Sequence, residues 1–106
     1  MPIDIKGKSD SALEEIRTAL QPYLDEHPSA DIVLYRQNSV SVRIRIVDSA
    51  FRGVSKADRH DLLWKLIENL PEESQQDVSV LLLLTPEETK ASLMSLEFED
   101  PAPSRL

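Results

Sequence analysis

The sequence predicts a single α+β domain in the order helix, strand, strand, helix, strand, with a short C-terminal helix after the last strand. Apolar residues recur at helical spacing over residues 11–27 and 56–70, while residues 39–47 alternate between polar and apolar side chains. Residues 78–84 form an apolar run that is too short for a buried helix. We therefore expect a three-stranded mixed sheet with helices on one face.

The length of 106 residues and the apolar content of 41% fit one domain with one core. Residues 1–10 lack periodicity, so we expect a loose lead-in there. The folded domain is predicted over residues 11–96. Residues 97–106 are acidic and then proline-rich, which is typical of a disordered tail.

The first helix has clear boundary residues. Ser11 and Glu14 have the spacing of a capping box, which predicts a helix start. Pro22 lacks an amide proton and is expected to kink the helix or to loosen its last turn. We expect the helix to end near Pro28.

The two strands at residues 30–37 and 39–47 are predicted to form an antiparallel hairpin, because only residues 37–38 offer turn material between them. In the second strand, Arg43 and Arg45 alternate with apolar residues. Both arginines are therefore expected on the solvent face of the sheet.

The second half of the chain predicts a right-handed crossover to a parallel strand. Ser55 caps a helix over residues 56–70, a polar loop follows at residues 72–77, and the strand occupies residues 78–84. Residues 85–95 begin with a helix-start pattern and are expected to form the C-terminal helix.

Composition narrows the classes of function. The chain has no cysteine and only two glycines, so it holds no cysteine-bound cluster by itself and no glycine-rich phosphate loop. The two histidines, His27 and His60, give no metal-ligand pair, and we expect no catalytic activity. The N-terminus lacks the parts of a signal peptide, and the longest apolar run is far shorter than the roughly 20 residues of a membrane span, so we expect a cytoplasmic protein.

The net charge of −7 argues against general nucleic-acid binding, which depends on contacts to phosphate. Positive charge is nevertheless concentrated in the middle of the chain. Four residues could form a local nucleic-acid-binding surface: Arg43, Arg45, Arg52 and Lys56.

The junction between the second strand and the second helix carries the most informative residues. Phe51 is expected to anchor the loop in the core, and Gly53 permits a turn that other residues resist. Arg59 can lay its aliphatic stem on the core and direct its guanidinium to loop carbonyls. His60 lies one turn before Trp64 at the edge of the apolar helix face.

Two interpretations of His60 remain open. Its imidazole is either partly exposed beside Trp64, available to a partner or a metal cluster, or it is structural and hydrogen-bonds the loop at residues 48–54. The first predicts a binding site, and the second predicts a stabilising contact.

The spacing of Phe51, Gly53, Arg59 and His60 resembles the signature of the BolA family, and the later residues 85–88, Thr-Pro-Glu-Glu, are similar as well. The resemblance covers roughly residues 11–95. It implies a small α/β domain of the class II KH type. The N-terminal half is also faintly similar to the NifU C-terminal domain, without the cysteines of that family.

The BolA resemblance implies a monothiol glutaredoxin as partner, a shared [2Fe–2S] cluster and a role in iron or stress regulation. It also implies His60 as a cluster ligand. Family members commonly carry a second ligand, a cysteine or histidine, in the hairpin loop, whereas this chain has Arg36–Ser39 there with neither.

We therefore expect a non-catalytic BolA-like adaptor that binds a protein partner. The alternatives are a KH-like nucleic-acid-binding or transcription-regulating module and a divergent member that has lost the ligand site. The residues expected to contact the partner lie at the junction: Arg52, Gly53, Lys56, Arg59, His60 and Trp64.

Overall fold

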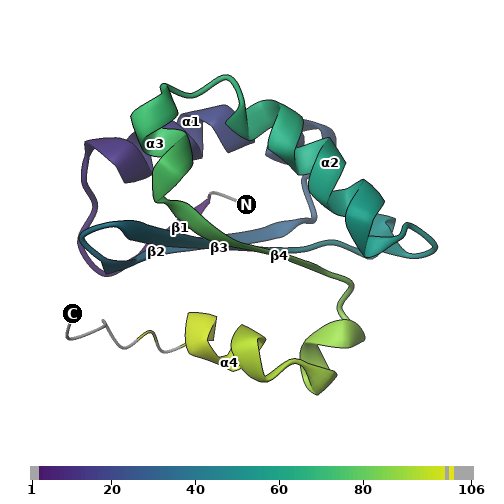
Figure 1. Ribbon diagram of the computed structural model, residues 1–106. Coiled ribbons are helices and arrows are strands. Elements are labelled where there is room, and N and C mark those ends of the chain that lie inside the picture. The colour runs from purple at the N-terminus through teal and green to yellow at the C-terminus, as the bar shows by residue number, and fades with distance from the viewer. Residues whose placement is uncertain (1–2, 100, 102–106) are drawn as a thin grey trace.

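The centre of the protein is a mixed sheet of four strands in the spatial order β1-β2-β3-β4 (Figure 1). A computed structural model describes residues 3–99 and 101. β2 and β3 form the predicted antiparallel hairpin, and β1 and β4 run parallel to their neighbours. The strands are β1 (Asp4–Lys6), β2 (Asp31–Asn38), β3 (Ser41–Val47) and β4 (Val78–Leu84).

The prediction of three strands, with residues 1–10 as a loose lead-in, is wrong because residues 4–6 form β1. Asp4 pairs with Val33 and Lys6 with Tyr35. Ile3 is buried in the core just before the strand. Burial of that side chain and the parallel ladder with β2 together hold this segment on the sheet.

Helices cover both faces of the sheet, whereas the sequence predicted helices on one face. Three of them lie over one face, and α4 lies under the other, as Figure 1 shows. The helices are α1 (Ser11–Glu26), α2 (Lys56–Ile67), α3 (Glu72–Asp77) and α4 (Leu93–Glu99), with short 3-10 turns η1 (Ser49–Phe51) and η2 (Glu88–Ala91). Among the described residues, no helix has both the length and the apolar character that a membrane crossing requires.

α1 begins and ends close to the predicted positions, but its details differ. Asp10, and not Ser11, is the N-cap, and its carboxylate accepts a hydrogen bond of 3.0 Å from the amide of Leu13. The helix continues through Pro22 to Glu26. The missing proline amide is tolerated because the following residues Tyr23 and Leu24 are buried and hold the last turn on the core.

The hairpin turns at residues 39–40, two residues later than predicted. The side-chain oxygen of Asn38 accepts a 2.9 Å hydrogen bond from the amide of Val40, which closes the turn. Val40 is therefore 67% exposed and does not join the apolar side of β3. The register shifts between Arg36 and Asn38, so Gln37 is the extra residue of a β-bulge.

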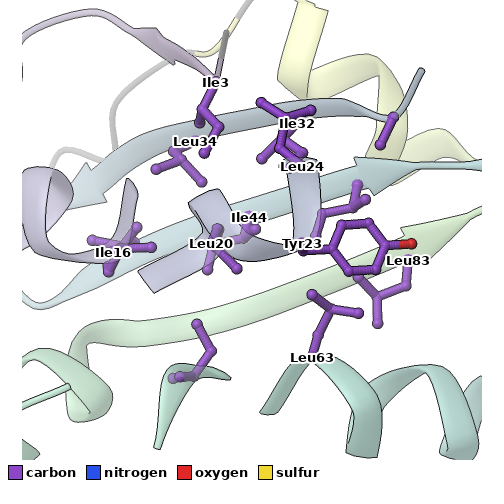
Figure 2. Packing of buried hydrophobic residues seen from close by; sticks show 14 of the residues in the cluster. Ile3, Ile16, Leu20, Tyr23, Leu24, Ile32, Leu34, Ile44, Leu63 and Leu83 are labelled. Carbon is purple, nitrogen blue, oxygen red and sulfur yellow. The ribbon is translucent and has the colours of Figure 1, made fainter. Parts of the chain in front are cut away.

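The main core fills the space between the sheet and the three helices above it. Figure 2 shows side chains of α1, including Leu20 and Leu24, meeting Ile32 and Ile44 of the hairpin and Leu63 of α2. These five side chains are all buried. This packing fixes α2, and therefore the junction that precedes it, against β4.

The segment after β4 differs most from the prediction. Residues 72–77, expected as a loop, form α3, and the expected helix at residues 85–95 is divided into η2 and α4. Residues 97–99, expected in a disordered tail, belong to α4 because Phe98 is fully buried against Tyr35 and Val33. The remainder of the predicted tail, apart from residue 101, lies outside the described residues.

Candidate functional site

The loop between β3 and α2 is a set of short turns closed by local hydrogen bonds. Asp48 caps η1 by accepting a 2.9 Å bond from the amide of Ala50, and Ser55 caps α2 by accepting a 3.1 Å bond from the amide of Asp58. Phe51 is buried, which confirms its predicted role as the anchor of the loop. Gly53 has a φ of 76°, a left-handed conformation that favours glycine.

Arg59 holds this loop from the inside. Its guanidinium donates hydrogen bonds of 2.9–3.0 Å to the carbonyls of Val54, Phe51 and Leu83. It also contacts the carboxylate of Glu88 at 2.6 Å and is only 4% exposed. The predicted guanidinium–carbonyl contacts are thus confirmed. These contacts bury the charge of Arg59, whereas the sequence predicted this residue on the partner-binding surface.

Glu88 is the main residue of this junction that the sequence did not single out. Its carboxylate accepts a 2.8 Å bond from the amide of Thr85, and its own amide donates to the Thr85 hydroxyl, which forms a capping box. The hydrogen bond from Arg59 lowers the pKa of Glu88 to about 2. The Thr-x-x-Glu spacing indicated the cap but not its arginine partner.

His60 lies on the outer side of the same helix turn. Its imidazole is exposed and stacks on the indole of Trp64, with the ring centroids 5.6 Å apart and the planes 13° from parallel. It makes no side-chain hydrogen bond with any residue that the structure describes. This geometry matches the exposed interpretation of His60. The loop contacts that the structural interpretation assigned to it are made by Arg59.

Lys56, His60 and Trp64 follow one another at a spacing of four residues along α2, and we call them the His60 surface. Lys56 and His60 line a cavity of about 230 Å³ with residues 81–84 of β4. Lys56 is exposed and forms no ion pair with any described residue. The surface therefore offers a cation, an imidazole and a partly buried indole beside an apolar strand.

The loop residues Arg52 and Gly53, beside the His60 surface, are exposed, but the charge of Arg52 is paired. Arg52 makes a two-pronged contact with Glu87, and both side chains are more than half exposed. This hydrogen bond lowers the pKa of Glu87 to about 2, so the pair is ionised and largely self-compensated at neutral pH. Gly53 is exposed next to it.

The prediction that Arg43 and Arg45 share an open solvent face is wrong because α4 covers that face. Arg45 is 3% exposed and bonds the carbonyl and hydroxyl of Ser95 and the carboxylate of Glu99. Arg43 contacts Glu97 and donates to the Tyr35 hydroxyl. These two arginines do not join Arg52 and Lys56 in one open basic surface.

The fit of an iron–sulfur cluster can be judged from the available ligands. The whole chain has no cysteine, and no group of three potential metal-ligating side chains occurs among the described residues. His60 provides a single imidazole. The chain alone therefore does not fit a [2Fe–2S] cluster, which needs further ligands from another molecule.

Comparison with known proteins adds no relative. No protein-family model, curated protein or solved structure matches this chain. A relationship to the BolA family therefore depends on the sequence resemblance.

Proposed function

We propose that this protein is a non-catalytic, BolA-like adaptor that binds a protein partner through the His60 surface. The proposal rests mainly on the exposed imidazole of His60, which stacks on Trp64 and makes no side-chain hydrogen bond to the described residues. An exposed imidazole stacked on a partly buried indole, beside a lysine without an ion pair to the described residues, has the composition of an interaction site. At such a site aromatic side chains supply contact area and a charge steers the partner.

The proposed partner is a monothiol glutaredoxin that shares a [2Fe–2S] cluster with this chain. Two features support it: the spacing of Phe51, Gly53, Arg59 and His60, and the exposure of the His60 imidazole at the surface. The absence of cysteine requires the partner and glutathione to supply the thiolate ligands. His60 contributes one imidazole.

Reconstitution tests the proposal. The purified chain is mixed with a monothiol glutaredoxin, glutathione, iron and sulfide, and the mass and visible absorbance of the mixture are measured. We expect a heteromeric complex whose cluster spectrum differs from that of the glutaredoxin alone. His60→Ala should remove that difference while changing the free energy of unfolding by no more than about 1 kcal/mol, since His60 is exposed.

Two results would count against the proposal. A complex with an unchanged spectrum in His60→Ala would contradict the ligand role, and the absence of any complex would favour a divergent member that has lost the ligand site. Lys65→Ala, also on α2 and exposed, is the matched control and should leave assembly unchanged.

Nucleic-acid binding through a KH-like sheet is the weaker alternative. Arg43 and Arg45 are engaged with α4, and Arg52 is engaged with Glu87. Lys56 is the remaining open cation of the predicted set. A salt-sensitive shift of single-stranded RNA or duplex DNA would favour this alternative.

A further inference from the structure

A second hollow lies at the other end of the sheet, beside the tip of the β2–β3 hairpin. It has a volume of about 580 Å³. This lies within the range of roughly 300–1,000 Å³ that is typical of small-molecule sites. It is lined by Lys6 at the end of β1, by residues 7–10 between β1 and α1, by residues 35–39 of the hairpin and by Pro101.

The lining of this hollow is basic, although the protein as a whole carries a charge of −7. Among the described residues, the lining holds three cations, Lys6, Lys8 and Arg36, and one carboxylate, that of Asp10. Arg36 is bound to Asp10 and to Asp77, so its charge is compensated within the fold. The hydrogen bond from Arg36 also lowers the pKa of Asp10, which keeps this pair ionised.

The two lysines have weaker or fewer contacts within the fold than Arg36 has. The ammonium of Lys6 donates to the backbone carbonyl of Glu99 at 3.3 Å and lies 4.0 Å from Asp4. Lys8 is exposed and makes no ion pair or side-chain hydrogen bond with any residue that the structure describes. Gly7, with a φ of 77°, turns the chain between them. Two lysines that line the same hollow within three residues of chain suit an anion that carries two negative charges.

Gln37 contributes a side-chain oxygen that lacks a hydrogen-bond donor among the described residues. The β-bulge places this residue in the lining, and its side-chain oxygen is buried without a hydrogen-bond partner among the described residues. Bulges commonly re-aim a side chain beside a functional site. Leaving a buried acceptor unsatisfied is unfavourable, and a ligand hydroxyl would satisfy it.

We propose that this hollow binds a small phosphomonoester that also carries hydroxyl groups, such as a sugar phosphate or a nucleoside monophosphate. The phosphate lies between Lys6 and Lys8, and a hydroxyl of the ligand donates to the Gln37 oxygen. The volume accommodates a sugar in addition to the phosphate. This site is separate from the His60 surface and does not depend on the function proposed for that surface.

Titration of the isotope-labelled full chain tests the proposal, with ribose 5-phosphate, AMP, inorganic phosphate and acetate as probes. We expect saturable shifts of the amides of residues 6–10 and 35–39 with both phosphomonoesters. Lys8→Glu should weaken their binding by about tenfold or more because it replaces an attractive charge with a repulsive one. Lys90→Glu, at an exposed lysine of η2, is the matched control and should bind as the parent does.

A second variant separates the two contacts. Gln37→Leu should weaken ribose 5-phosphate while leaving inorganic phosphate unchanged. Tighter binding of AMP than of ribose 5-phosphate would assign the nucleotide, and the reverse would assign the sugar phosphate. If neither phosphomonoester causes saturable amide shifts at concentrations up to about 10 mM, the proposal is overturned. Equal binding of acetate, or parent-like binding by Lys8→Glu, would overturn it as well.

Discussion

Arg59 and Glu88 form an ion pair at 2.6 Å that joins the first turns of α2 to the segment after β4. His60, the next residue along the chain, is exposed and stacks on Trp64. The helical repeat of 3.6 residues turns these consecutive side chains about 100° apart. One residue of the Arg-His pair therefore stabilises the junction from inside, and the other remains available at the surface.

The buried arginine should be far more important for stability than its exposed neighbour in the loop. Arg59→Ala removes the guanidinium that donates to the carboxylate of Glu88 and to three carbonyls, so we expect the free energy of unfolding to fall by about 1–3 kcal/mol. Arg52→Ala breaks an exposed pair that solvent screens, so it should change the free energy of unfolding far less than Arg59→Ala does. Urea denaturation of both variants measures the difference, and equal losses would contradict the structural role of Arg59.

The same pair predicts a dependence of stability on pH. Arg59 lowers the pKa of Glu88 from its usual value of 4.5 to about 2 in the folded protein. Its stabilising contribution is therefore complete above about pH 4.5 and is lost as the pH falls towards 2. Glu88→Gln should flatten the acid limb of the stability curve in this window. A variant with the same acid limb as the parent would show that Glu88 is not held in this way.

The docking of α4 should depend on Phe98, which is fully buried, packs edge-on against Tyr35 and lies under the guanidinium of Arg45. We expect Phe98→Ala to speed hydrogen exchange throughout α4 and to reduce stability by up to about 3 kcal/mol. Leu96→Ala, at a 63% exposed position of the same helix, should change stability by about 0.5 kcal/mol or less.

The same Phe98→Ala variant also tests the nucleic-acid alternative. Loss of α4 contacts would release Arg43 and Arg45, which α4 engages in the parent. If these arginines form a latent basic surface, the variant should bind single-stranded RNA at low salt more tightly than the parent. Unchanged exchange in α4 would show instead that Phe98 does not dock the helix.

The turn before α2 should require glycine for its backbone conformation alone. Gly53 has a φ of 76°, and an added Cβ would meet nothing within 4 Å. Gly53→Ala should therefore cost about 1–2 kcal/mol, the penalty of the left-handed conformation. Gly53→Asn should cost less, because asparagine tolerates this region better. An equal cost for both variants in urea denaturation would point to a cause other than backbone conformation.

The sequence predicted the elements whose signals are local. The alternation in β3, the apolar run of β4 and the caps of α2 all lie within a few residues of the structure they specify. β1 was missed because three residues carry no periodicity and become a strand only by pairing with β2. α4 was misplaced because the burial of Phe98 depends on Tyr35 and Val33, which are distant in sequence.

The candidate site at the junction before α2 could also be predicted in part from the sequence. The exposed position of His60 and the inward guanidinium of Arg59 follow from helix geometry and loop chemistry. The burial of Arg45 could not be predicted, because alternation along a strand identifies a polar face without showing what covers it. The hollow at Lys6 and Lys8 could not be predicted either, because it depends on the pairing of β1 with the hairpin.

The central claim, that a partner binds the His60 surface, is tested most directly by mapping a monothiol glutaredoxin onto the isotope-labelled chain by NMR. We expect the perturbed amides to cluster on residues 52–64 and 81–84, with those shifts abolished by Lys56→Glu combined with His60→Ala. Residues 6–10 and 35–39, at the far end of the sheet, should not move. Perturbations confined to that far end or to α4, or none at a concentration that saturates a micromolar complex, would contradict the account.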